Sequence, residues 1–214
     1  MIVNVVEATI HSKIVYVGPA MSGKTTTLKV LSEYYREKVI NDFLSIENTS
    51  GRTLYFDYLL MYFRNRKYSL KTHIYSTTGQ DFYAVTRPDT IRNLDGIVFV
   101  ADSAKNALIR NITSWKELEI YLGTNFIIIP KVIVFNKQDL EEKFDKRLFL
   151  NAIKVHKYRN LDLMDSVAVE KEGVVPTFRK ILKLILENSE SLNSEENKVN
   201  NTYLDGKKES LLNF

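Results

Sequence analysis

The run GPAMSGKT (18–25) has the residue types and spacing of a loop that binds phosphate groups. It follows the strand-like run KIVYVG (13–18) and precedes residues whose apolar positions recur at helical spacing. In that context, backbone N–H groups and a helix N-terminus attract phosphate oxygens. We expect Lys24 to reach the β- and γ-phosphates and the Thr25 hydroxyl to ligate magnesium. The loop residues expected to contact a nucleotide are Gly18, Ala20, Met21, Ser22, Gly23, Lys24, Thr25 and Thr26.

A second polar run, NKQD (136–139), comes directly after the buried strand-like run KVIVFN. A carboxylate at Asp139 can accept hydrogen bonds from N1–H and the 2-amino group of guanine, whereas adenine offers no such pair of donors. We expect Asn136 to bond across the pocket and the aliphatic stem of Lys137 to cover the base. A polar strand-to-helix turn, or an ATP-dependent kinase or ATPase, is the alternative, in which Asp139 is incidental.

A third run, VAVEKEGV (167–174), lies further along the chain and completes the guanine hypothesis. The backbone N–H of Ala168 is expected to meet the guanine carbonyl, with Val167 and Val169 on either side of it. Alone, NKQD is a weak signal, but downstream of the phosphate loop and ahead of VAVEKEGV it becomes a strong one. The order of the three motifs along the chain predicts a site for a guanine nucleotide.

Residues 11–187 resemble the Ras-like small GTPases, and in particular the MglA-type (gliding-motility polarity) group and its archaeal Rab-like relatives. The resemblance rests on KIVYVGPAMSGKTT, GRTLYFDYL, GQDFYAVTR and LDGIVFVADSA. It implies a cytoplasmic molecular switch that binds GTP and GDP with Mg²⁺ and hydrolyses GTP. It also implies a roadblock-fold regulatory protein as partner, with any contact to a membrane made through a partner.

The resemblance assigns roles to residues between the phosphate loop and the guanine motif. Thr53 is the threonine that senses the γ-phosphate and magnesium, and Gln80 orients the attacking water. Gly79, directly before Gln80, is assigned to nucleotide binding. Arg52 stands where the MglA-type group has a built-in arginine finger; the alternative is a solvated loop charge. Ala20 favours the built-in finger. Ras-type loops have a glycine at this position, which leaves room for an arginine supplied by a partner, whereas with alanine an arginine from the same chain is the easier geometry.

One position departs from the usual GTPase pattern. In the run IYSTTGQ (74–80), Ser76 occupies the place of an aspartate that holds a magnesium-bound water. A hydroxyl can still bond that water, and loss of an outer ligand costs about 10–100-fold rather than the whole function. Asp57 is a second candidate for holding that water, because residues 53, 55 and 57 share one face of a predicted strand. The alternative is that Asp57 is a satisfied strand carboxylate. We therefore predict a slow GTPase, with a hydrolysis-poor nucleotide-binding scaffold as its rival.

Composition sets the broad class. The chain has 214 residues, 44% hydrophobic and 26% charged, which is typical of one globular domain. It has no cysteine, which suits the cytosol, and we expect no signal peptide, membrane span or lipid anchor. The formal net charge of +4 comes without interleaved base-stacking aromatics, so we do not expect nucleic acid as a partner.

Strand-like runs alternate with helical patterns, which predicts an α/β P-loop NTPase fold of the Ras type. We expect a mostly parallel six-stranded sheet flanked by helices, with an extra N-terminal strand over 2–10. Residues 1–187 form the predicted GTP-binding domain and 188–214 a polar, flexible tail. The loop NDFLSIENTSG (41–51) is expected either to order with the γ-phosphate or to be an inert surface loop. The other predicted elements are strands at 13–18, 96–102, 131–136 and 165–169, a hairpin on either side of 64–67, and helices over 24–40, around Trp115, over about 145–157 and along Val174, Phe178, Ile181 and Ile185.

Overall fold

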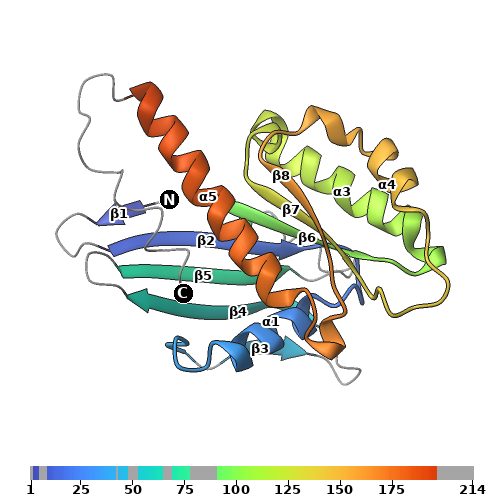
Figure 1. Ribbon diagram of the computed structural model, residues 1–214, viewed down its shortest axis with the longest axis horizontal. Helices are drawn as coiled ribbons and strands as arrows, with labels where there is room; N and C mark the ends of the chain where they lie inside the picture. Colours follow the sequence, from blue (N-terminus) through green and yellow to red (C-terminus); the bar gives the residue numbers. More distant parts are fainter. Residues whose placement is uncertain are drawn as a thin grey trace.

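A mostly parallel sheet with helices on both faces makes up the computed structural model, which describes residues 2–4, 9–41, 43–47, 53–64, 69–77 and 91–196 (Figure 1). Within these ranges, side chains at 2–4, 45–47, 53–55 and 190–196 are not described. The strands are β1 (Ile2–Asn4), β2 (Thr9–Val17), β3 (Leu44–Glu47), β4 (Thr53–Arg64), β5 (Ser69–Thr77), β6 (Gly96–Asp102), β7 (Lys131–Asn136) and β8 (Leu161–Asp165). The α-helices are α1 (Lys24–Tyr34), α3 (Leu108–Leu122), α4 (Lys146–Ala152) and α5 (Val174–Glu196).

The strand order across the described sheet is β3-β4-β5-β2-β6-β7-β8, with β1 paired to β2. Strands β5, β2, β6, β7 and β8 run parallel, whereas β4 pairs antiparallel with β5 to form the predicted hairpin. Strand β1 is antiparallel to β2. The predicted fold class is confirmed: β4, β5, β2, β6, β7 and β8 form the six-stranded sheet, and β1 is the extra N-terminal strand. The prediction of 2–10 for that strand was too long, because β1 ends at Asn4 and Thr9 and Ile10 belong to β2. Strand β3 was not predicted; it occupies part of the expected loop and pairs antiparallel with β4.

The last strand was placed wrongly from the sequence. The prediction was 165–169, but β8 ends at Asp165 and a short 3₁₀ turn, Ala168–Glu170, follows. Residues 161–165 pair in register with β7 from Lys131 to Phe135, so the sheet itself selects the earlier segment. The residues of β8 are only half-buried or exposed, because this is an edge strand, and it therefore lacked the apolar run that marks the inner strands.

Three helices differ in length from their predictions. Helix α1 ends at Tyr34, and the residue after it, Tyr35, packs against Phe63 and Phe178 in the core. Helix α4 ends at Ala152, and the chain passes through a left-handed Lys154 into a 3₁₀ turn. Helix α5 continues to Glu196, so the first residues of the predicted tail are helical.

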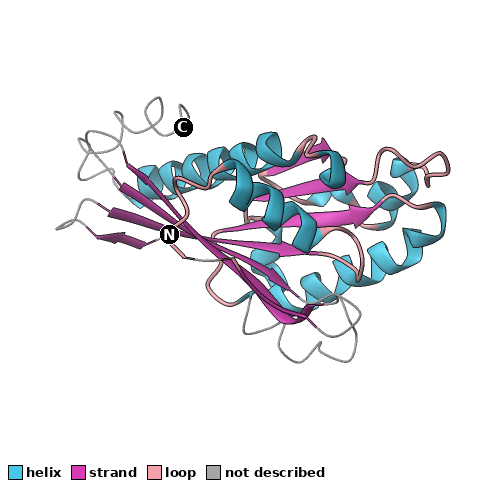
Figure 2. Cartoon of the chain, turned by 90° about the horizontal axis from the view of Figure 1, so that it is seen from below, coloured by secondary structure: helices cyan, strands magenta, loops and turns pink. Residues whose placement is uncertain are grey.

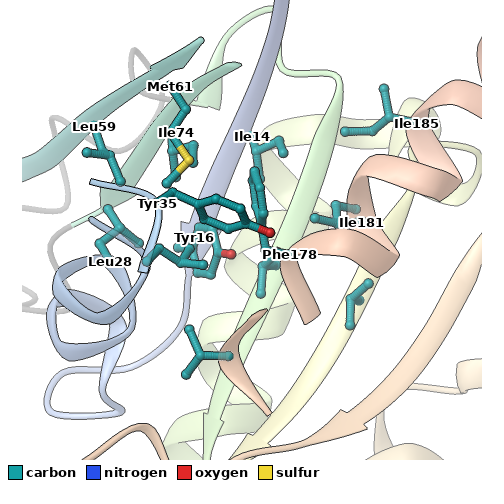
Figure 3. Packing of buried hydrophobic residues seen from close by; sticks show 14 of the residues in the cluster. Ile14, Tyr16, Leu28, Tyr35, Leu59, Met61, Ile74, Phe178, Ile181 and Ile185 are labelled. Carbon is teal, nitrogen blue, oxygen red and sulfur yellow. The ribbon is translucent and has the colours of Figure 1, made fainter. Parts of the chain in front are cut away.

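The apolar core lies in two layers, one on each face of the sheet. Figure 3 shows the layer beneath α1 and α5, where Ile14 and Tyr16 of β2 meet Phe178, Ile181 and Ile185 of α5. The other layer lies beneath α3 and α4 and is centred on fully buried aromatic side chains: Phe99, Trp115, Phe126, Phe135 and Phe149. Figure 2 shows the strands between the two helical layers. Packing in these two layers fixes the sheet, and the carboxyl ends of its parallel strands therefore lie together at one edge, where ligands of α/β proteins bind.

Of the site residues predicted from the sequence, Arg52, Gly79 and Gln80 lie outside the described residues, and the side chain of Thr53 is not described. The backbone of Thr53 opens β4 and pairs with Glu47 of β3. In the described part of the chain, no helix combines the length and the hydropathy that crossing a bilayer requires.

Candidate nucleotide site

The phosphate loop connects the carboxyl end of β2 to the first turn of α1. Gly18 has φ 140°, and a Cβ there would lie 2.3 Å from the carbonyl oxygen of Val100 on β6, so the residue that follows β2 has no room for a side chain. Met21 and Gly23 also have positive φ, 63° and 103°. Such left-handed positions let a short loop turn its backbone N–H groups inward, as an anion-binding concavity requires.

Two side chains of this loop suit an anion. The ammonium group of Lys24 is buried and donates to the carbonyl oxygens of Gly18 at 2.9 Å and Pro19 at 2.7 Å, so the cation lies over its own loop. The hydroxyl of Ser22 is fully buried and has no hydrogen-bond partner among the residues that the structure describes. Leaving a buried hydroxyl unpaired costs about 1–3 kcal/mol. A phosphate oxygen in the loop would accept from both groups, so the residues present fit a phosphate.

Asn136 joins three segments that are far apart in the chain. Its Nδ2 donates to the carbonyl oxygen of Ser22 at 2.8 Å, and its Oδ1 accepts from the hydroxyl of Ser166 at 2.9 Å and from the backbone N–H of Ala168 at 3.0 Å. A Cβ at Gly23 would lie 2.2 Å from Asn136 Nδ2, so glycine allows this close approach. The structure therefore brings the three predicted motifs to one place.

The remaining guanine residues lie around this junction. Asp139 is exposed, and Lys137 has φ 66° and donates from Nζ to Asp102 at 2.9 Å. Val167 is buried and Val169 is exposed. The N–H of Ala168 bonds to Asn136 rather than pointing freely outward, so its predicted contact with the guanine carbonyl stays a prediction.

A buried carboxylate lies beside the expected magnesium ligand. Asp57 of β4 has no exposed surface, and its Oδ2 accepts from the Thr25 hydroxyl at 2.7 Å and from the Ser76 hydroxyl at 2.7 Å. Asp57 and Ser76 are direct cross-strand partners on β4 and β5. The contact with Thr25 places Asp57 beside the phosphate loop, and the same two hydrogen bonds satisfy it as a strand carboxylate, so the structure is compatible with both interpretations that the sequence allowed.

One group of residues beside the NKQD loop was not predicted from the sequence. Asp102 at the end of β6 contacts Lys137, and Asn111 of α3 holds the Asp102 backbone by two hydrogen bonds, Asp102 N to Asn111 Oδ1 at 3.0 Å and Asn111 Nδ2 to Asp102 O at 2.8 Å. The available signal was an acidic residue at the carboxyl end of a buried strand, where α/β ligand sites lie.

These features are those of a P-loop domain with a Ras-type sheet. The Ras family pattern matches residues 13–187. The mutual gliding-motility protein MglA of Myxococcus xanthus (strain DK1622) is 33% identical over 188 residues, which is 86% of this chain and 95% of that protein. The Ras-related protein YPTC6 of Chlamydomonas reinhardtii is 27% identical, over 87% of this chain and 81% of that protein.

A third relative, the Ras-related protein rab-11.1 of Caenorhabditis elegans, is 28% identical over 116 residues, or 53% of each chain. The chain belongs to the Ras family, and the resemblance to Ras-like and MglA-type proteins is confirmed. Membership of this family supports the interpretation of the chain as a small GTPase of the molecular-switch class.

Proposed function

We propose that this chain is a small GTPase switch that binds GTP and GDP with Mg²⁺ and hydrolyses GTP slowly. The contact between Thr25 and Asp57, 2.7 Å from hydroxyl to carboxylate, carries the proposal. It puts a negative charge next to the hydroxyl that P-loop proteins use as a metal ligand. The substitution of the usual aspartate by Ser76 is therefore compatible with metal binding, because Asp57 provides a carboxylate one strand away.

The donor set beside the phosphate loop suits magnesium. Mg²⁺ prefers oxygen ligands and keeps several of its waters, so one hydroxyl and one nearby carboxylate, with phosphate oxygens, are an adequate set. Thr25 would ligate the ion directly, Asp57 would accept a hydrogen bond from one of its waters, and Thr53 would join with the γ-phosphate. Bound Mg²⁺ would offset the charge that develops on the phosphate oxygens.

Hydrolysis is assigned to two residues by resemblance to the family. Gln80 would orient the attacking water, and Arg52 would stabilise the transition-state charge, an effect of about 10³–10⁵ in rate when an arginine finger is in place. Ala20 supports an arginine supplied by the chain itself, because its methyl group narrows the approach for an arginine from a partner. Slow hydrolysis is expected because the outer metal ligand is not the usual one.

The rival is a nucleotide-holding scaffold in which GTP stabilises a docking surface and hydrolysis is vestigial. Ser76 is the observation that favours it, since a serine hydroxyl carries no charge. In either case, the family resemblance supports a roadblock-fold regulator as partner, and contact with a membrane through a partner.

Single-turnover release of phosphate from the GTP-loaded protein, with and without Mg²⁺, tests the proposal. We expect slow, magnesium-dependent release that falls by at least about tenfold in Arg52→Ala. Arg36→Ala is the matched control, because Arg36 is exposed and follows the opposite end of α1 from the phosphate loop. GTP that stays bound and intact would favour the scaffold, and tighter binding of ATP than of GTP would contradict both.

A further inference from the structure

A fully buried carboxylate lies at the carboxyl end of β6, beside the NKQD loop. The side chain of Asp102 has no exposed surface, and its Oδ2 accepts from Lys137 Nζ at 2.9 Å. Arg110 of α3 contacts the same oxygen through Nη2, and Asp102 Oδ1 accepts from the backbone N–H of Ala104 at 3.0 Å. Burying a carboxylate is costly unless it is paired and hydrogen-bonded, and these contacts offset that cost for Asp102.

The position of this carboxylate is fixed by its own backbone. Asn111, which is fully buried, bonds to both the N–H and the carbonyl oxygen of Asp102. Asp102 also faces Asn136 across the β6–β7 ladder, so Lys137 is the residue that directly follows its strand partner. Because Lys137 comes directly after β7, its side chain is within reach of the Asp102 carboxylate, whose backbone Asn111 holds in place.

The two loops are joined at further points. The backbone N–H of Ser103 donates to the Asn136 carbonyl oxygen at 3.1 Å, and Gln138 Nε2 donates to the Ser103 hydroxyl at 2.7 Å. Lys137 itself has a left-handed backbone, which non-glycine residues adopt only when the surroundings impose it. Its side chain is 32% exposed, so the amine is tied while part of the stem remains accessible.

We propose that Asp102 is a positioning residue for nucleotide binding: by holding Lys137 Nζ, it orders in advance the aliphatic stem that covers the guanine base. The inference rests on the proposed function. A free lysine side chain has many rotamers, and binding that must select one of them is weaker than binding to a stem already in place. Arg110 supplies the second positive charge that allows the carboxylate to remain buried.

The rate at which a fluorescent GDP analogue leaves the protein, chased with excess unlabelled GDP, tests this inference through a double-mutant cycle. Asp102→Asn and Lys137→Met are each expected to speed release about tenfold, the size of one lost charged hydrogen bond. In the Lys137→Met background, Asp102→Asn is expected to add less than about twofold, because the group it acts through is already gone. If Asp102 had only a structural role, the two substitutions would act independently, and their effects on the release rate would multiply.

The remote ion pair between Lys180 and Asp162, with N–O distance 3.2 Å, supplies the control cycle. Asp162→Asn and Lys180→Met should each change release by less than about twofold. Multiplying effects at Asp102 and Lys137 would overturn the inference alone, whereas a wild-type chain that binds no GDP would overturn the proposed function as well. Lys137→Met keeps the apolar stem and removes only the anchored charge. Unchanged release from this variant would therefore overturn the inference whether or not Asp102→Asn folds.

Discussion

The carboxylate of Asp57 on β4 accepts a hydrogen bond of 2.7 Å from the hydroxyl of Ser76, its cross-strand neighbour on β5. The same carboxylate oxygen accepts from Thr25 of the phosphate loop. The serine that replaces the usual aspartate is thus joined to an aspartate on the adjacent strand. The negative charge of this part of the site is displaced by one strand and not lost.

Removing that charge should weaken the response to magnesium. We expect Asp57→Asn to raise the Mg²⁺ concentration needed for half-maximal phosphate release by about 10–100-fold, the usual cost of losing an outer metal ligand. Ser76→Ala should have a smaller effect, because the Thr25–Asp57 bond remains. A magnesium titration of single-turnover release measures both variants, with thermal unfolding as the check on folding. Identical titration curves for Asp57→Asn and wild type would remove Asp57 from the metal site.

Gln80→Leu should separate binding from hydrolysis. We expect GTP affinity to stay within about twofold, while hydrolysis slows on the order of 10²-fold, because the attacking water loses its orientation. Equilibrium binding of a fluorescent GTP analogue and single-turnover hydrolysis measure the two quantities on the same sample. If both fell together, Gln80 would hold the site's structure rather than position water.

Asp139→Asn should relax the preference for guanine. The carboxylate is exposed at the site, and its loss removes the acceptor for two guanine donors. We expect the ratio of GTP to ATP affinity to fall by about 100-fold or more. ATP competition against labelled GTP measures it, and Glu141→Gln, an exposed carboxylate in the same loop, is the control. An unchanged ratio in Asp139→Asn would place base recognition elsewhere.

Lys131 should make stability depend on pH above neutrality. It is fully buried between the rings of Phe126 and Tyr158, and burial lowers its pKa to about 7. An unfolded lysine has a pKa near 10.4, so between these values the unfolded chain binds more protons and stability rises with pH. The destabilisation caused by burying the charged Lys131 side chain is fully present below about pH 7, and it disappears as the pH approaches the pKa of lysine in the unfolded chain.

Urea unfolding at pH 7, 8 and 9 measures this effect against Lys131→Met, in which it is absent. From pH 7 to pH 9 the wild-type chain should gain about 2 kcal/mol of unfolding free energy relative to the variant. Tyr158 does not disturb this window, because burial raises its pKa to about 12. Parallel pH profiles for the two proteins would mean that Lys131 keeps its proton in the folded state.

Parts of the fold with strong local signals could be predicted from the sequence. The inner strands β6 and β7 are continuous apolar runs, and the hairpin of β4 and β5 has long alternating arms, so both were identified. The edges were harder: β3 and β8 are short, and pairing with a neighbour rather than composition decides that they are strands. Helix ends were likewise set by packing, as at Tyr35 beneath α5.

By itself, the sequence determined the motifs of the candidate site: the phosphate-loop motif, the NKQD motif and an unusual serine, each encoded within a few consecutive residues. Only the tertiary structure decided which distant residues complete it. Thr25 meets Asp57, and Lys137 meets Asp102, across 32 and 35 positions of the chain. Such contacts depend on strand order and register, because a slip of one residue turns every side chain of a strand to the other face. That information is carried by the pairing of the whole sheet, and no short stretch of residues contains it.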